Sequence, residues 1–494
     1  RDTDRSRGLG DVYKRQGIQY NLNKLIRLKI GDIMYHIDFN KPVHVYFMGI
    51  GGISMSGLAD ILLSKGFRIS GSDMKQSELT DRLISQGVPV HIGQTADNIT
   101  DDIDVAVYTA AIHPDNPEFA AITAKGIPVL TRAELLGEIM SNYKVAIGVS
   151  GTHGKTTTTS MLTEILLAAG LDPTVSVGGM LHSIGGNLRV GHSSNFITEA
   201  CEYTNSFLSF CPTIGVILNV QEDHLDFFKD IDDIRHSFRR YAALLPADGL
   251  LVINGDIDNY SYITEDTKCP VVTVGSTSSC DYTAADITFN DTGCCSYTLI
   301  HHSKECGRIT LGVPGIHNVY NSLAAIAVAV HLGIGPDVYT KSLLAFHGTD
   351  RRFQKKGELN GFTIIDDYAH HPAEIAATLA SAANYPHNRI VVIFQPHTYT
   401  RTKAFLNDFA DVLAHGADEV ILADIYAARE KNTLGISSAD IKALIDKTGT
   451  PCLYEPDFHK IEQHIVDTCR PGDLVITMGA GNIVDVGEEL LKNY

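Results

Sequence analysis

The 494-residue sequence has no uninterrupted run of about 18 apolar residues, the length a membrane-spanning helix needs, so no membrane span is predicted. Positive charge is also scarce, because 40 lysines and arginines face 58 aspartates and glutamates and leave a net charge of −18. A chain this acidic is a poor general binder of phosphate backbones, although backbone amides can still bind anions locally. We therefore expect neither a nucleic acid nor a membrane as partner.

Cysteine is present but lacks the spacings that would give it a special role. The nine cysteines form no CxxC pair and no metal-ligand pattern. This usage predicts reduced thiols in a cytoplasmic protein. Only Cys294 and Cys295 are adjacent, and we expect them in a surface loop rather than in a redox site.

Residues 1–16, RDTDRSRGLGDVYKRQ, have no apolar periodicity and no apolar core of a signal peptide. We interpret residues 1–33 as a non-native or disordered leader. A natural start is then expected at Met34, just before the first predicted strand.

Strands and helices alternate along the rest of the chain, which predicts an α/β fold with parallel sheets. Single cores stop growing near about 250–300 residues, so several domains are expected. Each of three blocks opens with a strand that runs into a distinctive loop. The predicted domains are residues 34–143, 144–349 and 350–494, and residues 269–309 are expected to form an antiparallel part of the second.

A glycine-rich loop joins the predicted strand Val145–Val149 to a helix that runs to Ala169. Backbone amides in such a loop, together with the helix N-terminus, attract phosphate. Lys155 would reach the β- and γ-phosphates, and the Thr156 hydroxyl would reach Mg²⁺. The predicted ATP-binding loop consists of Gly151, Thr152, His153, Gly154, Lys155, Thr156 and Thr157.

Two strands beside this loop end in groups that can bind a metal ion. Strand Asn195–Thr198 is followed by Glu199, and His224 comes shortly after strand Thr213–Leu218. A carboxylate suits Mg²⁺, whereas imidazole prefers softer metals. On the sequence pattern alone, His224 is more often a hydrogen-bonded structural residue.

The first block carries a second glycine-rich turn, Gly49-Ile-Gly-Gly52, after a strand. The turn allows close approach of a diphosphate, and Asp73 is placed to accept a ribose hydroxyl. These features fit NAD and a UDP compound equally well. The P-loop block favours UDP, because dehydrogenases seldom carry a P-loop domain. The expected contacts are Gly49, Gly51, Gly52, Ser72, Asp73 and Thr109.

The strands of the third block all end in polar residues. Because the carboxyl ends of parallel strands meet at one rim of a sheet, these residues should face a ligand crevice. His370, His397 and Arg401 are the candidates, and Arg401 suits a carboxylate because arginine binds it bidentately.

Several strings resemble the Mur ligase family. They are the loop GTHGKTTTT and GIHNVYNSLAAIAVA, which spans Gly315–Ala329. Further strings resemble the alanine-adding member of the family: Gly49–Gly57, Asp366–Pro372, Phe394–Arg401 and Ala428–Lys431. The resemblance extends from about Lys41 to the C-terminus.

The resemblance implies three domains: a Rossmann-like N-terminal domain for a UDP-sugar, a central P-loop ATPase-type domain, and a Rossmann-like C-terminal domain for an amino acid. It implies an ATP-dependent ligase that joins L-alanine to the lactyl carboxylate of UDP-N-acetylmuramate through an acyl phosphate, in peptidoglycan precursor synthesis. ATP would become ADP and phosphate with Mg²⁺, or alternatively Mn²⁺. A monomer or homodimer is expected.

The same resemblance assigns roles to individual residues. Those implied to be catalytic are Lys155, Glu199, His224 and Arg352. Thr156, Glu199 and His224 are the implied metal ligands. Asn318, Arg352 and Asp367 are implied to contact ATP, and His370, His397 and Arg401 to surround the alanine.

Three alternatives remain on the sequence alone. A ligase for recycled peptides or for folate polyglutamylation is opposed by the alanine-type strings. An NAD-dependent oxidoreductase leaves Lys155 unexplained. A non-catalytic nucleotide-binding relative would be expected to lack Lys155, Glu199 or Arg401, all of which are present.

Overall fold

The computed structural model describes residues 35–109, 111–225, 227–428 and 430–494. The predicted leader at residues 1–33, the start at Met34 and Arg429 of the Ala428–Lys431 string lie outside the described residues. The described residues divide into two compact units, residues 35–142 and 143–494. No helix in the described ranges is long and apolar enough to cross a membrane.

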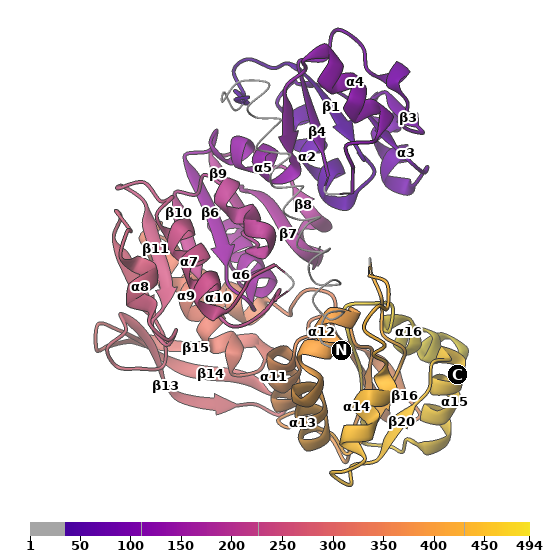
Figure 1. Ribbon diagram of the computed structural model, residues 1–494. Helices are drawn as coiled ribbons and strands as arrows, with labels where there is room; N and C mark the ends of the chain where they lie inside the picture. The colour runs from indigo at the N-terminus through magenta and orange to yellow at the C-terminus, as the bar shows by residue number, and fades with distance from the viewer. Residues whose placement is uncertain (1–34, 110, 226, 429) are drawn as a thin grey trace, which may run out of the picture. The chain divides into compact units, whose positions relative to one another are not determined.

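The first unit is built on a five-stranded sheet in the order β3-β2-β1-β4-β5 (Figure 1). All neighbouring strands are parallel. The strands are β1 (His44–Met48), β2 (Arg68–Asp73), β3 (Val90–Ile92), β4 (Val105–Tyr108) and β5 (Val129–Thr131). Its helices are α2 (Ile53–Ser64), α3 (Glu78–Ser85), α4 (Pro117–Lys125) and α5 (Arg132–Met140). The central strand β1 is buried along its whole length, as expected for a parallel strand covered on both faces.

The second unit contains two sheets, of which the larger has ten strands in the order β15-β14-β13-β12-β11-β10-β6-β9-β7-β8. The strands are β6 (Val145–Ser150), β7 (Thr174–Leu181), β8 (Gly186–Arg189), β9 (Asn195–Glu199), β10 (Ile214–Ile217), β11 (Leu250–Asn254), β12 (Val271–Val274), β13 (Tyr282–Phe289), β14 (Cys294–His301) and β15 (Lys304–Pro314). The sheet is parallel from β12 to β7. The predicted antiparallel part is confirmed, because β13, β14 and β15 pair antiparallel.

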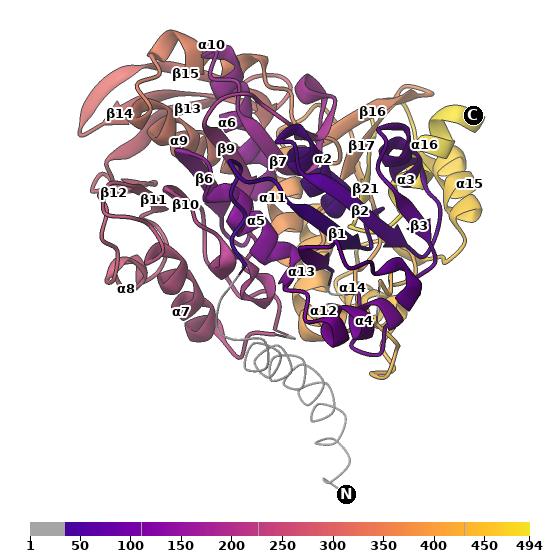
Figure 2. The same cartoon turned by 90° about the horizontal axis from the view of Figure 1, so that it is seen from above.

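Three helices cover this sheet with a shared apolar cluster: α6 (Lys155–Ala168), α9 (His317–His331) and α10 (Pro336–Ala345) (Figure 2). The helix α9 is buried along most of its length because it packs against α6 as well as the sheet. Another helix, α7 (Ile231–Ala242), is fixed to β6 by a buried hydrogen bond of 2.9 Å from the Tyr241 hydroxyl to the carbonyl oxygen of Gly148. These contacts hold the strand and helix on either side of the predicted phosphate loop.

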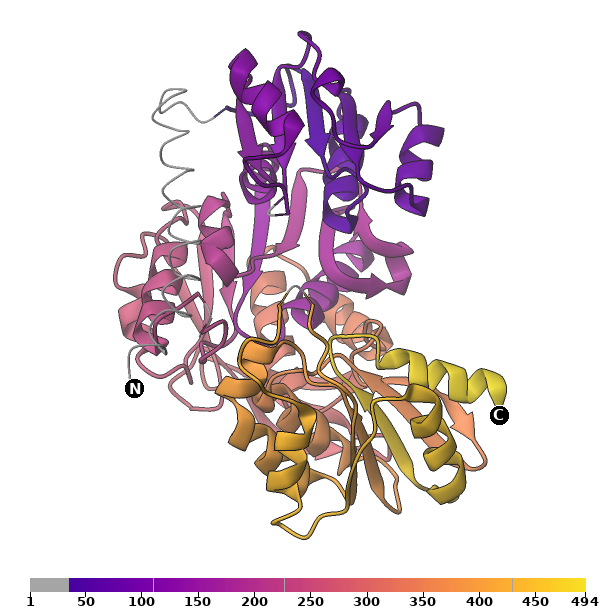
Figure 3. The ribbon, with the colours of Figure 1, turned by 45° about the vertical axis from the view of Figure 1, so that its right-hand side comes forward.

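The smaller sheet of the second unit has the order β16-β17-β21-β18-β19-β20. Its strands are β16 (Gln354–Leu359), β17 (Phe362–Asp367), β18 (Ile390–Phe394), β19 (Glu419–Leu422), β20 (Cys452–Tyr454) and β21 (Leu474–Met478). Only the edge pair β16–β17 is antiparallel. One apolar cluster joins the sheet to α11 (Pro372–Ala382), α13 (Leu406–Gly416) and α14 (Ser438–Ile445), and a second joins it to α15 (Phe458–Thr468) and α16 (Val484–Asn493). Figure 3 shows the orange and yellow helices on the two sides of this sheet.

The predicted α/β class with mostly parallel sheets is confirmed, but the prediction for the paired cysteines is wrong. Cys294 and Cys295 begin strand β14, and Cys295 is fully buried in the core of the larger sheet. Cysteine packs as a small apolar residue, and the neighbouring polar sequence concealed this.

Candidate active site

The phosphate loop lies between β6 and α6, and its glycines adopt a conformation that other residues avoid. Gly151 has φ of 136° and Gly154 has φ of 84°. A Cβ on Gly154 would lie 2.6 Å from Oδ1 of Asn321, so a side chain does not fit there. The loop is held by Asn219, whose Oδ1 accepts from the amide of His153 at 2.7 Å and whose Nδ2 donates to the carbonyl oxygen of His153 at 3.0 Å.

Lys155, the first residue of α6, is a paired cation. Its Nζ lies 3.0 Å from Oε2 of Glu202 and also donates to the carbonyl oxygens of Gly151 and Thr152. Burial alone would lower the pKa of Lys155, but Glu202, with smaller effects from Cys201 and Glu199, raises it above its ordinary value. Lys155 is therefore charged at neutral pH.

Two predicted metal ligands, Glu199 and Thr156, lie at element ends beside this loop. Glu199 is the last residue of β9, and its carboxylate accepts from the amide of Gly178 at 2.5 Å. Thr156 is buried in the first turn of α6. Parallel pairing of β6 with β9 brings the end of β9 next to the loop.

His224, the third predicted metal ligand, lies close to two acidic residues. Its ring stacks on Tyr203 with the centroids 4.4 Å apart. Its Nε2 lies 3.9 Å from Oε1 of Glu202 and 3.7 Å from Oδ2 of Asp223. Burial lowers the pKa of His224 although Asp223 and Glu202 oppose this, so the ring is neutral at physiological pH and retains a lone pair. Within the described ranges, no group of three or more His, Cys, Asp or Glu side chains is arranged to hold a metal.

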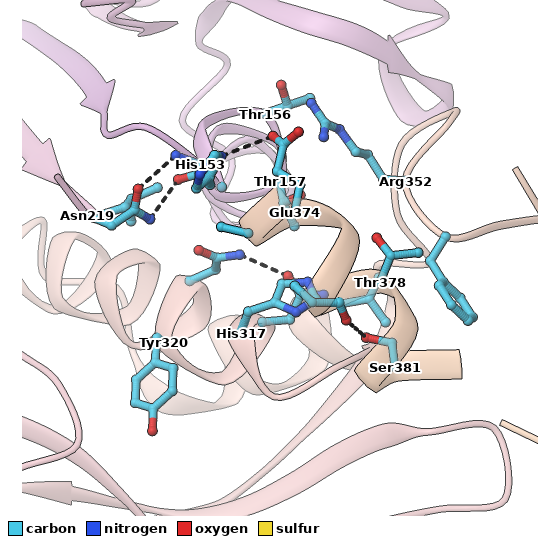
Figure 4. Close-up of a pocket in the computed structure, with 18 of the residues that line it drawn as sticks. His153, Thr156, Thr157, Asn219, His317, Tyr320, Arg352, Glu374, Thr378 and Ser381 are labelled. Carbon is cyan, nitrogen blue, oxygen red and sulfur yellow. Dashed lines mark hydrogen bonds and ion pairs between the residues drawn. The ribbon is translucent and has the colours of Figure 1, made fainter. Parts of the chain in front are cut away.

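A pocket of about 280 Å³ opens beside the phosphate loop (Figure 4). It joins residues from both sheets of the second unit: the predicted His153, Gly154, Thr156, Thr157, Asn318, Arg352 and Asp367 all line it. The side chain of Asn318 is fixed, since its Nδ2 donates to the carbonyl oxygen of Pro314 at 2.7 Å and its Oδ1 accepts from Asn321 at 2.9 Å.

Arg352 and Asp367 form the side of the pocket that the smaller sheet contributes. The guanidinium carbon of Arg352 lies 5.3 Å from the centre of the Tyr368 ring. Asp367 accepts from the amides of Phe353 at 2.8 Å and Ala369 at 2.7 Å. Burial raises the pKa of Asp367 to about 6, against the opposing charge of Arg352.

The predicted amino-acid residues His370, His397 and Arg401 lie together after β17 and β18. The rings of His370 and His397 are 5.6 Å apart, and Nη1 of Arg401 lies 3.4 Å from Nδ1 of His397. Burial, together with the charges of His370 and Arg401, lowers the pKa of His397 to about 4. Arg401 also pairs with Asp223 at 2.9 Å, with 11% and 10% of the two side chains exposed.

Sequence reasoning assigned no role to several residues that the structure places here. Asn219, Asn321 and Glu374 line the pocket, Glu202 pairs with Lys155, and Asp223 pairs with Arg401. Asn321 could have been found because it lies in the string Gly315–Ala329, and Glu202 and Asp223 lie beside predicted residues in the sequence. Nothing in the sequence indicated that Glu374 on α11 would contact the phosphate loop.

The glycine turn of the first unit follows β1, as predicted. Gly49 has φ of 81°, and the amide of Gly51 donates to Oδ2 of Asp73 at 2.9 Å. A Cβ on Gly51 would lie 2.8 Å from that oxygen. The Ser72 hydroxyl is buried and donates to Glu118 at 2.6 Å, while Thr109 lies next to Gly49. Asp73 therefore stabilises the turn. Gly52 is the N-cap residue of α2.

Three family models match successive parts of the chain. "Mur ligase family, catalytic domain" matches residues 44–144, "Mur ligase middle domain" residues 149–329, and "Mur ligase, glutamate ligase domain" residues 351–481. Together they cover most of the described residues.

Two relatives share more than half of their residues with this chain. The UDP-N-acetylmuramate–L-alanine ligase of Lachnospira eligens is 62% identical over 460 residues, which is 93% of this chain and all of the relative. That of Agathobacter rectalis is 60% identical over 459 residues, with the same coverage. A crystal structure of the UDP-N-acetylmuramate–alanine ligase of Thermotoga maritima matches with a TM-score of 0.74 at 28% identity, over 91% of this chain and 99% of that one.

Proposed function

The chain belongs to the Mur ligase family, and we propose that it joins L-alanine to the lactyl carboxylate of UDP-N-acetylmuramate at the expense of ATP. The reaction forms a C–N bond and releases ADP and phosphate. It is a step of peptidoglycan precursor synthesis. The full-length relatives named for this activity support the substrates.

One structural observation carries the assignment to this chemistry. The phosphate loop, which contains the charged Lys155, lines the same pocket as Arg352 through His153, Gly154, Thr156 and Thr157. His370, His397 and Arg401 gather at the strand ends of the smaller sheet. An ATPase needs no site for an acceptor other than water. A ligase needs a second group of side chains that can hold an acceptor, and the second unit contains both.

The chemistry proceeds in two balanced steps. A lactyl carboxylate oxygen attacks the γ-phosphorus of ATP, and the bond to the bridging oxygen breaks so that ADP leaves. The amine of alanine then attacks the carbonyl carbon of the acyl phosphate, phosphate leaves with the electrons of the broken C–O bond, and the nitrogen loses a proton. Phosphoryl transfer depends on positioning and charge neutralisation, which Lys155 and Arg352 supply as fixed cations.

Arg401 is assigned to the carboxylate of the incoming alanine. Guanidinium binds a carboxylate bidentately, and the partly buried position of Arg401 strengthens that pairing. His370 and His397 flank it and contribute hydrogen bonds around the amine.

Thr156 and Glu199, beside the phosphate loop, would hold a magnesium ion, and Glu199 with the neutral His224 would hold a second divalent ion. An ion that keeps several waters and binds phosphate oxygens needs only a few protein ligands. Mn²⁺ takes the same oxygen ligands as Mg²⁺ and is the alternative ion. When bound, the ion neutralises charge on the phosphates.

The remaining assignments are part of the same proposal. Residues 34–143 bind the UDP-sugar, with Gly49, Gly51, Gly52, Ser72, Asp73 and Thr109 at the turn. Residues 144–349 bind ATP through Gly151 to Thr157 and Asn318, and residues 350–494 add Arg352, Asp367 and the amino-acid site. We propose a cytoplasmic enzyme that acts as a monomer or homodimer.

The test is phosphate release from ATP with UDP-N-acetylmuramate, in the presence and absence of L-alanine, for the wild type and Lys155→Ala. We expect release that requires both substrates and is lost in the variant. Turnover that needs a tripeptide or glutamate instead of alanine would redirect the proposal to another ligase. A protein that binds ATP but turns over no acceptor would contradict it.

A further inference from the structure

Glu374 is a partly buried carboxylate that contacts residues of both sheets of the second unit. Its Oε1 lies 3.1 Å from Nδ1 of His153, a residue of the phosphate loop. Its Oε2 accepts from the amide of His370 at 3.1 Å and lies 3.2 Å from Nδ1 of the same residue. Figure 4 shows the contact between His153 and Glu374 at the edge of the pocket. One side chain therefore contacts the proposed ATP site and the proposed alanine site.

Helix capping explains only half of this arrangement. Glu374 is the third residue of α11, where an acidic side chain is favoured by the helix dipole and by capping of free amides. The hydrogen bond from the amide of His370 is of that kind. The contact of Oε1 with His153, 221 residues away, satisfies no amide of α11.

The carboxylate also determines which ring nitrogens carry hydrogen. Nδ1 of His153 faces Glu374, and Nδ1 of His370 faces both Glu374 and, at 3.0 Å, the carbonyl oxygen of Tyr368. These neighbours are all acceptors, so each Nδ1 carries hydrogen and the two rings are fixed in orientation.

The other nitrogen of His153 then faces a ligand, and it donates to phosphate oxygens when the ring is the imidazolium that the adjacent Glu374 carboxylate favours. Its Nε2 is buried and has no hydrogen-bond partner among the described residues, and His153 lines the pocket. A buried polar atom is usually paired, so this nitrogen is explained by a group that binds in the pocket.

The charge of Glu374 is consistent with this arrangement. Burial would raise the pKa of its carboxyl group, but the charge of His370 and the hydrogen bonds from His153 and His370 lower the pKa well below its ordinary value. Both oxygens therefore remain acceptors at neutral pH.

We propose that Glu374 is a positioning residue that orients His153 toward the phosphates of ATP and His370 toward L-alanine through a single carboxylate. The part of this proposal that concerns His370 and L-alanine rests on the proposed function. The part that concerns His153 requires only that the pocket binds ATP.

The decisive variant is Glu374→Gln. Glutamine caps a helix as glutamate does, but it has one acceptor oxygen instead of two, so it cannot hold both rings. We expect an unchanged melting temperature. The Kd for ATP, measured by calorimetry without other substrates, and the KM for L-alanine should each rise about tenfold, as for loss of a hydrogen bond to a charged group.

Double-mutant cycles identify the route of each effect. We expect His153→Ala to weaken ATP binding in the wild type but to change it less than about twofold in the Glu374→Gln background. His370→Ala should behave in the same way toward the KM for L-alanine. Glu358→Gln is the matched control, because Glu358 is an exposed acid of β16 whose ion pair within the described chain is with Lys355; neither constant should change.

Two results would overturn the inference. One is an effect of Glu374→Gln on only one constant, or on neither. The other is an effect of each histidine substitution that multiplies with that of Glu374→Gln, because independent sites give additive free energies.

If Glu374→Gln melts at a lower temperature, the cycles are repeated with Glu374→Asp, whose shorter carboxylate should keep the helix cap and lose the contact with His153. If the wild type binds ATP but has no alanine-dependent turnover, the proposed function fails, and the ATP cycle alone decides the His153 half.

Discussion

The Nζ atom of Lys155 lies 3.0 Å from a carboxylate oxygen of Glu202, whose side chain is only 3% exposed. This pair places the phosphate-loop cation beside an acid to which the sequence pattern assigned no role. A buried charge that loses its partner is costly, whereas removal of both charges is much less so. The pair therefore separates the stability role of Lys155 from its catalytic role.

Lys155→Met should lower both activity and stability. It removes the phosphate-binding charge, so phosphate release should fall at least about a thousandfold. It also leaves Glu202 unpaired, which should lower the melting temperature by roughly 5 °C. The double variant Lys155→Met/Glu202→Gln should regain most of the lost melting temperature and none of the activity. A double variant that melts below both single variants would contradict this account of the pair.

Arg401→Ala should raise the KM for L-alanine and leave the KM for ATP almost unchanged. Loss of the guanidinium removes the carboxylate anchor and exposes the substrate to the unpaired Asp223, so the KM for L-alanine should rise about a hundredfold while the KM for ATP stays within about twofold. The wild type should prefer L-alanine to L-alaninamide, and the variant should lose this preference.

The matched control for Arg401 is Lys403→Ala, an exposed cation on the same short helix α12 (Tyr399–Ala404). It should leave both KM values unchanged. Retained discrimination between L-alanine and its amide in Arg401→Ala would show that another group binds the carboxylate.

Asp367 gives a pH dependence with a defined sign. Its pKa is about 6 in the folded protein against an ordinary 3.8, so the native state binds a proton more tightly than the unfolded chain. The stability this provides is complete below pH 3.8 and is lost as pH rises through 6. At about 1.4 kcal/mol per pH unit, the loss is about 3 kcal/mol.

Asp367→Asn cannot ionise and should escape this loss. Relative to wild type, its melting temperature should rise steadily between about pH 4 and pH 6 and then level off, since all other titrating groups are shared. Scanning calorimetry at half-unit pH steps measures this difference. A difference that stays constant from pH 4 to pH 7 would mean that the buried carboxyl does not titrate in this window.

The sequence predicted the features that are encoded locally. A strand, a glycine turn and a helix follow one another within about 25 residues at the phosphate loop, and each has its own composition signal. The convergence of His370, His397 and Arg401 followed from the rule that parallel strands end on one side of a sheet. Those residues lie together as that rule requires.

What the sequence could not predict are the partners of these residues. Arg401 and Asp223 are 178 positions apart, and His153 and Glu374 are 221 apart. Their pairing depends on how the larger and smaller sheets of the second unit pack, which no local pattern specifies. The surface-loop prediction for the cysteines of β14 was wrong for a related reason. The neighbouring strands decide whether a residue of an antiparallel hairpin is buried.

Gly154→Ala tests whether the shape of the phosphate loop, separately from its charge, is needed for ATP. Gly154 combines a left-handed backbone with a Cβ position only 2.6 Å from Oδ1 of Asn321, so alanine must displace either the loop or the asparagine.

Gly170→Ala is the matched control, because Gly170 follows the same helix with φ of 72° and has no atom within 4 Å of its Cβ position. Both variants carry the strain of a left-handed alanine, about 1–2 kcal/mol, so Gly170→Ala should lose a few degrees of melting temperature and Gly154→Ala at least as many. Only Gly154→Ala should weaken ATP binding measured by calorimetry, by at least about tenfold, because only there does the added methyl group disturb the amides that face phosphate. Equal ATP affinities in the two variants would mean that Lys155 binds the nucleotide without the loop geometry.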